Sequence, residues 1–441
     1  MKALNKRIKW DNYLEALSSC QPYKLEGKIV KVAGIVAEAS GPGLSVGSLC
    51  SIKTSEGQNI PAEVIGFNDQ RVIVMPFGEM RGIEPGSRII DISKKPTVPV
   101  GESYLSRVID GLGRPIDNKG MIRPEKEYPI YGNVQNPMKR EIIREVIDVG
   151  VCSINALNTL GKGQRIAIMA GSGVGKSILM GMIARNTSAD VSVIALIGER
   201  GREVREFVER NLGEAGLKKA VVVVATSDSP ALVRIRGAHL ATTLAEYFRD
   251  KGLDVMLIMD SISRFAMSMR EVGLAAGEPP SAKGYTPSVF IQIPKLLERA
   301  GTVEKKGSIT GIYNVLVEGD DMNEPIADAV RSTVDGHIVL SRDLAHKDHY
   351  PAVDVLASIS RVMSDIIDRR HLENARKLVK VMAAYREAED LINIGAYVDG
   401  SDPQIDYAKK MIGKINAFLQ QDTHQKITFK ESVDRLQALF A

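Results

Sequence analysis

The 441-residue sequence lacks the features that mark secreted, membrane-spanning and zinc-binding proteins. It has only three cysteines, Cys20, Cys50 and Cys152, and their spacing matches no metal site, which indicates a reducing compartment. No run approaches the ~20 apolar residues of a membrane-spanning helix. The basic start of the chain also lacks the apolar stretch of a secretory signal. We therefore expect a cytoplasmic protein.

The chain also has a small net charge and few aromatic side chains. The 58 basic and 54 acidic side chains leave a formal charge of +4. A net charge this small does not indicate a strongly acidic binding partner. Between Leu25 and Thr97 the only aromatic residues are Phe67 and Phe77. A single-stranded RNA-binding barrel needs more stacking side chains than this. We predict no nucleic-acid partner, which counts against an RNA helicase.

The hydrophobic pattern divides the chain into four regions. A leader over residues 1–24 precedes short β-branched segments over 25–97, which predict a small β-barrel. Over residues 98–348 apolar strands alternate with helical stretches, which predicts an α/β domain with a parallel sheet. The pattern from 349 to 441 is helical throughout. The expected buried strands of the α/β domain are 164–169, 191–198, 220–227, 254–260 and 337–341.

A glycine-rich loop between an expected strand and an expected helix is the most informative motif. Strand, glycines, Gly-Lys-Ser and helix are the context of a phosphate-binding P-loop, in which the lysine reaches the phosphates and the serine ligates Mg²⁺. Ala170 stands where the first glycine is usual, which is tolerable if this residue keeps a strand conformation. The predicted nucleotide-binding residues are Gly171, Ser172, Gly173, Val174, Gly175, Lys176, Ser177 and Ile178.

Two acidic residues follow other expected strands. Asp260 ends one such strand, where P-loop proteins place the carboxylate that orients Mg²⁺, although it could also cap the next helix. Glu199 follows another strand, and a carboxylate there can polarise the water that attacks ATP. The alternative for Glu199 is a solvated charge cluster. The six histidines form no ligand pattern, so we predict no metal other than Mg²⁺.

Four segments together carry a family resemblance: the P-loop, IGERGREV, MDSISRFAMSMRE and PAVDVLASIS. The chain resembles the rotary ATP synthase catalytic-subunit superfamily, and within it the flagellar type III export ATPases, with the virulence export ATPases as near twins. The resemblance covers residues 20–441. It implies a RecA-like P-loop parallel-sheet core with an N-terminal β-barrel and a C-terminal helical domain.

The resemblance also implies roles for individual residues. Lys176 and Ser177 become the phosphate and Mg²⁺ residues, and Glu199 becomes the catalytic carboxylate, with Arg200 beside it in the catalytic set. Tyr350 stacks on adenine, unless it is only a packing aromatic. Arg361 becomes an arginine finger that reaches into the site of a neighbouring subunit. The implied cofactors are ATP and Mg²⁺.

The implied function is ATP hydrolysis that energises type III export of unfolded flagellar proteins by a homohexamer at the inner face of the cytoplasmic membrane. The virulence export ATPase is the main alternative. A catalytic subunit of a proton-translocating rotary ATPase is less favoured, because residues 386–397 lack an acidic run of the DELSEED type. The implied partners are a central coiled-coil stalk protein, the export gate, chaperones and export substrates.

Two segments are candidates for partner binding. Glu271–Ser288 is rich in glycine and proline, which predicts a mobile loop or an inert linker. The resemblance implies that this loop faces the ring channel and contacts the coiled-coil stalk. In the leader, Trp10, Leu14 and Leu17 fall on one face of a helix, with basic residues beside it. The resemblance suggests that this helix binds a stator-like regulatory protein. Packing on the barrel and contact with anionic lipid are the alternatives.

Overall fold

The computed structural model describes residue 10 and residues 26–41, 43–93, 96–132, 134–317, 319 and 321–441. The chain forms two compact units, Met1–Pro96 and Thr97–Ala441, each with its own core. The leader helix expected within residues 1–24 lies outside the described residues except for Trp10, whose side chain is exposed. The bounds of the four predicted domains stay predictions.

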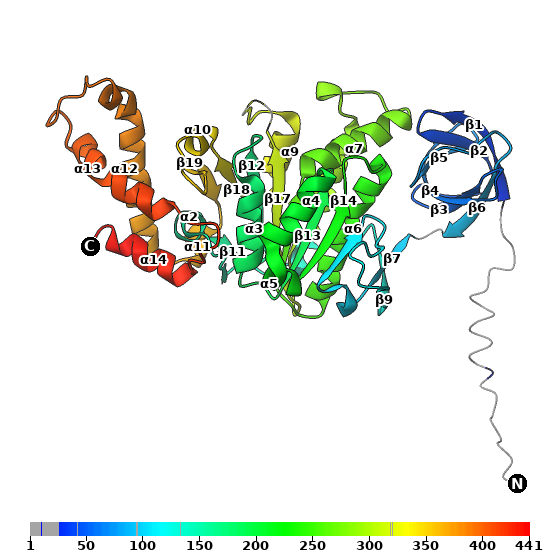
Figure 1. Cartoon of the computed structure of the whole chain (residues 1–441), viewed down its shortest axis with the longest axis horizontal. Coiled ribbons are helices and arrows are strands. Elements are labelled where there is room, and N and C mark those ends of the chain that lie inside the picture. The colour runs from blue at the N-terminus through cyan, green and yellow to red at the C-terminus, as the bar shows by residue number, and fades with distance from the viewer. Residues whose placement is uncertain are drawn as a thin grey trace, which may run out of the picture. The chain divides into compact units, whose positions relative to one another are not determined.

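The first unit contains a closed six-stranded barrel with the strand order β1-β2-β5-β4-β3-β6 (Figure 1). All pairs around it are antiparallel. Alternating residues such as Cys50 and Ile52 point into its core. This is the barrel that the sequence predicted. Its strands are β1 Glu26–Ala33, β2 Val36–Ser40, β3 Leu49–Lys53, β4 Asn59–Asn68, β5 Arg71–Pro76 and β6 Arg88–Ser93.

The second unit is built on a nine-stranded sheet with the order β19-β18-β12-β17-β15-β13-β14-β8, and β16 pairs with β17. From β18 to β8 the neighbouring strands are parallel, whereas β19 and β16 are antiparallel to their neighbours. The strands are β8 Arg107–Asp110, β12 Arg165–Ala170, β13 Val191–Ile197, β14 Ala220–Ala225, β15 Val255–Asp260, β16 Gly301–Thr302, β17 Ser308–Leu316, β18 Gly336–Leu340 and β19 Val353–Ser360. Two further pairs are β7 Thr97–Val100 with β9 Lys126–Pro129, and β10 Val146–Ile147 with β11 Leu160–Gly161.

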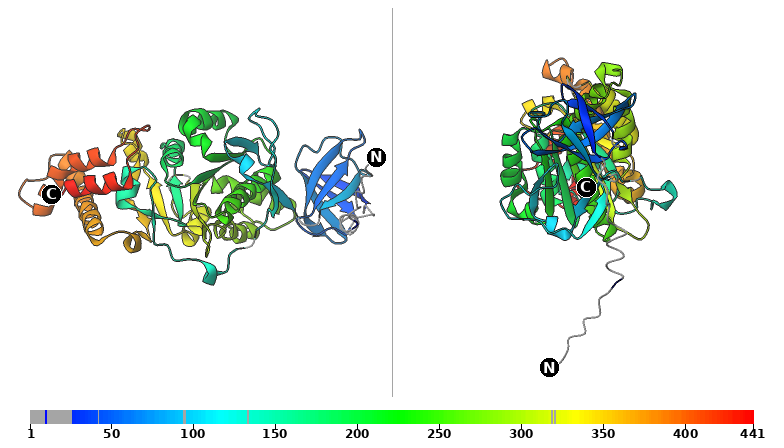
Figure 2. Two further views of the ribbon diagram at one scale, coloured as in Figure 1. Left: turned by 90° about the horizontal axis from the view of Figure 1, so that it is seen from below. Right: turned by 90° about the vertical axis from the view of Figure 1, so that its right-hand side faces the viewer.

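Helices cover both faces of this sheet (Figures 1 and 2). One face carries α2 Cys152–Leu157, α3 Lys176–Asn186, α4 Gly201–Glu206, the π-helix Phe207–Leu212 and α5 Gly213–Lys218. The other carries α6 Ala231–Asp250, α7 Ile262–Ala275, α8 Pro287–Leu297 and α9 Pro325–Thr333. Because both faces are covered, the central strands are apolar throughout, as the sequence predicted.

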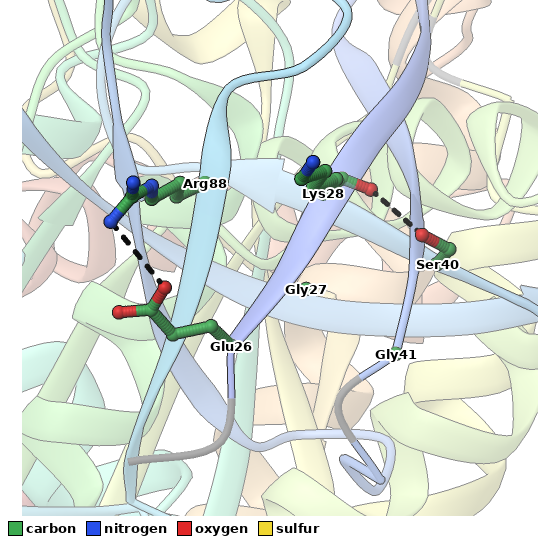
Figure 3. Close-up of a pocket in the computed structure, with 6 residues that line it drawn as sticks. All are labelled: Glu26, Gly27, Lys28, Ser40, Gly41 and Arg88. Atoms are coloured by element: carbon green, nitrogen blue, oxygen red, sulfur yellow. Dashed lines mark hydrogen bonds and ion pairs between the residues drawn. The ribbon is translucent and has the colours of Figure 1, made fainter.

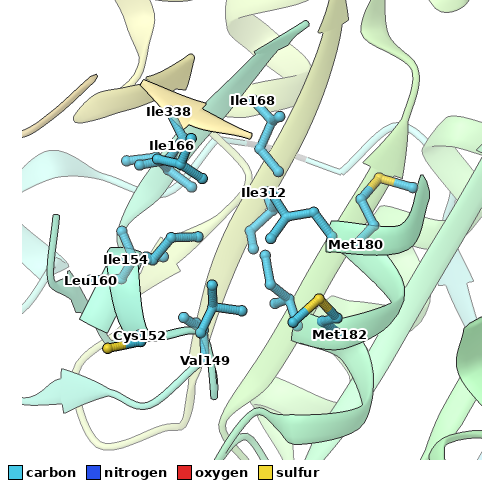
Figure 4. Close-up of a cluster of buried hydrophobic side chains, with 14 of the residues drawn as sticks. Val149, Cys152, Ile154, Leu160, Ile166, Ile168, Met180, Met182, Ile312 and Ile338 are labelled. Carbon is cyan, nitrogen blue, oxygen red and sulfur yellow. The ribbon is translucent and has the colours of Figure 1, made fainter. Parts of the chain in front are cut away.

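The core beneath the P-loop joins three layers of the second unit. Figure 4 shows isoleucines of β12, β17 and β18 packed with methionines of α3 and residues of α2. Side chains at alternate positions, such as Ile166 and Ile168, face this cluster. Close packing of this kind fixes the position of β12 relative to α3, and therefore the shape of the loop between them.

The prediction that the chain is helical from Tyr350 onward is wrong for residues 353–360. These form β19, the edge strand of the sheet, in which buried Val353 and Val355 alternate with half-buried Asp354 and Leu356 at the period of two that a strand gives. The helices follow: α11 Met363–Ile366, α12 Arg369–Asn393, α13 Pro403–Leu419 and α14 Phe429–Ala438, while the short α10 Arg342–His346 precedes the strand. Figure 1 shows α12 and α13 as a hairpin.

The predicted loop at 271–288 is shorter than expected. Helix α7 continues to Ala275 and α8 begins at Pro287, so only residues 276–286 connect the two helices. Alanine and leucine near the end of α7 are good helix formers, which explains the extension. Among the described residues, no helix is both long enough and apolar enough to cross a membrane.

Candidate active site

The P-loop connects β12 to α3 at the carboxyl edge of the sheet. Ala170 is the last residue of β12 and keeps the strand conformation that its methyl group requires. Gly173 and Gly175 have φ values of 80° and 84°, in the left-handed region that favours glycine. The amino end of α3 follows at Lys176. Unpaired N–H groups and the helix dipole make this end an anion-binding site.

Tyr350 lies against the end of the P-loop. A Cβ atom built on Gly175 would be 3.2 Å from Tyr350 Cε1, so a side chain at this position would meet the ring. Tyr350 is 36% exposed, which leaves part of the ring surface accessible. The structure therefore brings this predicted adenine-stacking residue next to the predicted phosphate site.

Three charged side chains meet beside the P-loop, and we call them the P-loop cluster: Lys176, Glu199 and Asp260. Lys176 Nζ lies 2.7 Å from Asp260 Oδ1 and 3.7 Å from Glu199 Oε1. They converge because β12, β15 and β13 end at the same edge of the sheet, with β17 between β12 and β15. Their side chains are 16%, 19% and 2% exposed, respectively.

The cluster has more negative than positive charge, and this changes its protonation. Burial raises the pKa of Glu199 to about 7, supported by the negative charge of Asp260 and a hydrogen bond with Glu203. Burial alone would lower the pKa of Lys176, but Asp260 and Glu199 outweigh it and raise that pKa. A carboxyl group with a pKa near neutrality is suited to general acid–base work.

A glycine before Glu199 sets the path of its loop. Gly198 has a φ of 76°, and a Cβ atom there would lie 2.7 Å from Arg264 Cβ on α7. Only glycine fits this approach. The backbone carbonyl of Glu199 also accepts the N–H of Ser227 at 3.0 Å. The loop is therefore held from two sides, with Glu199 facing Lys176.

Asn314, in β17, is a fourth residue of this region that the sequence analysis missed. Its Nδ2 donates to Asp260 Oδ1 at 3.0 Å and to Met180 Sδ at 3.1 Å. The signal was an asparagine between Tyr313 and Val315 in the mostly apolar second half of this strand. Glu203, one helical turn after Glu199, was missed as well.

Two predicted catalytic arginines lie away from the P-loop cluster. The side chain of Arg200 is 76% exposed and pairs with Glu203 at 3.2 Å. Arg361 follows β19, and its N–H donates to the carbonyl of Asp335, at the amino edge of the sheet. Asp335 is level with Arg165 at the start of β12, and the P-loop begins six residues later, about 20 Å along the strand at ~3.3 Å per residue. Arg361 is exposed.

The oxygen ligands available beside the P-loop fit Mg²⁺. Mg²⁺ is usually held by one or two protein oxygens together with phosphate oxygens and water. Ser177 at the start of α3 and Asp260 at the end of β15 can supply the protein ligands. Within the described parts of the chain, no group of three or more His, Cys, Asp and Glu residues could hold a metal ion by itself.

A separate pocket of about 420 Å³ lies on the barrel unit (Figure 3). Two of its charged groups are paired, since Glu26 Oε2 lies 3.7 Å from Arg88 Nη1. Ser40 Oγ donates to the carbonyl of Lys28 at 3.5 Å. Its six lining residues include no cluster of catalytic groups, and we assign it no part in the chemistry.

Family models match most of the second unit and most of the barrel. The nucleotide-binding domain of the ATP synthase alpha/beta family matches residues 150–360. The beta-barrel domain of the same family matches residues 29–92, and the T3SS EscN ATPase C-terminal domain matches residues 367–438. The three matches correspond to the barrel, the P-loop sheet and the C-terminal helices.

Whole-chain relatives agree with these models. The flagellum-specific ATP synthase of Bacillus subtilis (strain 168) is 51% identical over 98% of this chain and 99% of that protein. The assembled ATPase EscN from the enteropathogenic E. coli type III secretion system has a TM-score of 0.89 and 44% identity, over 94% of this chain and 100% of EscN. EscN in complex with its central stalk EscO gives a TM-score of 0.87, also at 44% identity, with the same shares covered.

These similarities define a P-loop ATPase with a barrel, a parallel-sheet core and a helical C-terminal region. The chain belongs to the ATP synthase alpha/beta family, in the branch that contains the flagellum-specific and type III secretion ATPases. It is an ATPase of type III export, and the fold class expected from the sequence is confirmed.

Proposed function

We propose that this chain hydrolyses MgATP at the P-loop cluster, as a homohexamer that energises type III export of unfolded flagellar proteins. The observation that carries this proposal is the meeting of Lys176, Glu199 and Asp260 beside the amino end of α3. A phosphate-binding loop, a metal-orienting carboxylate and a carboxyl group with a near-neutral pKa are the parts that ATP hydrolysis requires.

The P-loop binds and orients the phosphates. Backbone N–H groups from Gly171 to Ile178 surround them, and Lys176 contacts the β- and γ-phosphates. Ser177 and Asp260 hold Mg²⁺, which when bound neutralises charge on the phosphate oxygens. Tyr350 stacks on the adenine through the exposed part of its ring.

Glu199 orients and polarises the attacking water. Its raised pKa means that it accepts a proton more readily than an exposed carboxylate does. The support of its loop by Gly198 and Ser227 keeps it directed at the γ-phosphate side of Lys176. Arg200 has a lesser role, bracing Glu203 through their ion pair.

Arg361 acts on the site of a neighbouring subunit. Because it lies at the amino edge of the sheet, its own chain's nucleotide is out of reach, whereas an adjacent copy in a ring can present one. An arginine finger supplied in trans contributes ~10³–10⁵ in rate. This placement supports a ring of identical subunits, each with a P-loop cluster and a finger.

The proposed partners follow from the export role. The loop at 276–286 faces the ring channel and contacts a coiled-coil stalk protein, as the stalk complex of EscN suggests. The leader binds a stator-like regulator. The export gate, chaperones and unfolded substrates complete the apparatus, with the ATPase in the cytoplasm at the inner face of the membrane. Virulence export is the second candidate, favoured by the likeness to EscN.

A subunit-mixing experiment tests the shared site. Glu199→Gln and Arg361→Ala rings should each be nearly inactive, with a loss of at least ~10²-fold in phosphate release. In mixed rings, some interfaces pair an intact Glu199 with an intact Arg361, so activity should return in part. If mixed rings form, as shown by co-purification of differently tagged subunits, and no mixture recovers activity, the trans-finger mechanism is wrong.

A further inference from the structure

Asn314 is buried at a position where an apolar residue would be expected. It is 0% exposed and belongs to β17, whose other residues near this end are Tyr313, Val315 and Leu316. Burying an amide group destabilises a protein unless the amide makes hydrogen bonds. An asparagine here therefore needs a reason beyond the packing of the strand.

Its position in the sheet places Asn314 between the two halves of the P-loop cluster. β17 lies between β12, which leads into the P-loop, and β15, which ends at Asp260. In the register of the sheet, Asn314 is level with Ile168 on β12. On the other side Tyr313 is paired with Met259, so Asn314 is level with Asp260.

The contacts of Asn314 converge on one oxygen atom. Asn314 Nδ2 lies 3.0 Å from Asp260 Oδ1, the atom that Lys176 Nζ contacts at 2.7 Å. The amide must present its NH₂ group here, because two oxygens facing each other at this distance would repel. The second contact of Nδ2, with Met180 Sδ on α3, holds the amide from the P-loop side.

The side-chain carbonyl oxygen of Asn314 is the second polar atom of the amide group. Asn314 Oδ1 is buried and has no hydrogen-bond partner among the described residues. An unpaired buried acceptor is costly, by about 1–3 kcal/mol. The amide therefore donates to Asp260 while its own oxygen, Oδ1, stays without a hydrogen bond among the described residues. This is unusual for a residue with only a packing role.

We propose that Asn314 is a positioning residue for the metal-bound nucleotide. Its amide fixes Asp260 Oδ1, which leaves Asp260 Oδ2 as the oxygen that would serve a metal ion held beside the P-loop. When Lys176 contacts the phosphates, Asn314 keeps the carboxylate in place. This inference rests on the proposed function, since it requires that Asp260 serves a nucleotide-bound metal ion. It adds a residue of β17 to a site otherwise built from β12, β13 and β15.

The test is the gain in nucleotide affinity that Mg²⁺ provides. Equilibrium binding of a fluorescent ADP is measured with Mg²⁺ and with excess EDTA, for the wild type, Asn314→Leu and Asn314→Ala. Loss of a partner that orients a metal ligand typically costs 10–100-fold in metal affinity. We therefore expect both variants to lose at least ~10-fold of the Mg²⁺-dependent gain, while affinity in EDTA changes less than about threefold.

Thr310→Val is the matched control. Thr310 is also buried on β17, and its Oγ1 accepts the N–H of Gly163 at 2.9 Å, at the opposite end of the strand. This variant loses one buried hydrogen bond on the same strand and should keep the full Mg²⁺-dependent gain. If it loses as much as the Asn314 variants, the effect is general destabilisation and the proposal is overturned.

The remaining outcomes are also decisive. If Asn314→Leu does not fold, Asn314→Ala, which adds no volume, gives the answer. If the folded Asn314 variants keep the wild-type gain, Asn314 is not a positioning residue, although the proposed function stands. If the wild type itself shows no gain with Mg²⁺, the proposed metal site fails and the inference fails with it.

Discussion

Two buried ionic clusters in the second unit resemble each other in composition and differ in how completely they are bonded. In the first, which we call the Arg299 cluster, Arg299 bonds both carboxylate oxygens of Glu246, at 2.9 and 2.7 Å. It also contacts Thr243, His239 and the carbonyl of Ile130. All five guanidinium N–H groups are used.

The P-loop cluster is bonded far less completely. The ammonium group of Lys176 lies beside two carboxylates, those of Asp260 and Glu199. Its 3.7 Å distance from Glu199 Oε1 is too long for a hydrogen bond. Among the residues that the structure describes, the nearby amide oxygen of Asn314 has no hydrogen-bond partner. A complete set of hydrogen bonds holds a fold in one arrangement, whereas an incomplete set leaves groups that can bind ligands and exchange protons.

Burial shifts the pKa of one group in each cluster, but in opposite directions: it lowers the pKa of His239 and raises that of Glu199. Burial, with the charges of Arg299 and Arg236, lowers the pKa of His239 to about 3, so it stays neutral across the physiological range. Burial and excess negative charge raise the pKa of Glu199 to about 7, within that range. The comparison therefore predicts opposite results when each cluster is mutated.

The largest expected effect on stability comes from Arg299→Met. This change leaves Glu246 buried without its partner, so the free energy of unfolding should fall by ~3–5 kcal/mol. The helical circular-dichroism signal reports on the second unit, which contains α2 through α14. Denaturant titration of that signal measures the loss, and nucleotide affinity below the unfolding transition should stay near the wild-type value. A loss under ~1 kcal/mol would show that the Arg299 cluster does not hold the fold.

A pH effect of intermediate size is expected at Glu199. Its folded-state pKa of about 7 lies above the ordinary value of 4.5, so the folded protein holds this proton more tightly than the unfolded chain does. Stability from this group is complete below pH 4.5 and is lost as the pH rises to about 7. Against Glu199→Gln, the wild type should lose roughly 2–3 kcal/mol across this window. A difference between the two proteins that is independent of pH would contradict the raised pKa.

The smallest effect is expected from an exposed ion pair. Lys347 Nζ lies 2.9 Å from Glu389 Oε1, but the two side chains are 63% and 31% exposed. Lys347→Ala should lower the free energy of unfolding by less than ~1 kcal/mol, because water and salt screen such pairs. The same denaturant titration, repeated at high salt, measures this. A loss above ~2 kcal/mol would contradict the claim that buried ion pairs in this protein stabilise the fold more than exposed ion pairs do.

Much of the P-loop cluster could be predicted because it depends on local patterns. The P-loop has a fixed spacing, and Asp260 and Glu199 each follow an apolar run that reads as a buried strand. Parallel strands bring their carboxyl ends to one edge, so three such residues meet whatever their separation in sequence. The barrel could be predicted for a similar reason, from short alternating segments and turns.

The rest depends on strand order and on contacts between distant segments. Asn314 enters the site because β17 lies between β12 and β15, and no local pattern reveals that order. Arg299 and Glu246 are 53 residues apart, and their pairing needs the segment after α8 to lie beside α6. The helical prediction for β19 followed the strong helical pattern of the residues after it. The sequence of β19 itself already alternates, largely, between apolar and polar residues, which indicates a strand.

The most direct test of the account compares binding with turnover in Glu199→Gln and Lys176→Ala. Equilibrium binding of labelled ATP is measured beside steady-state phosphate release. Lys176→Ala should bind ATP weakly, because it loses the phosphate contact. Glu199→Gln should bind ATP at least as well as the wild type and release phosphate ~10²–10⁴-fold more slowly, because only the water loses its partner. Turnover near the wild-type rate in Glu199→Gln would contradict the claim that the incompletely bonded cluster is the catalytic site.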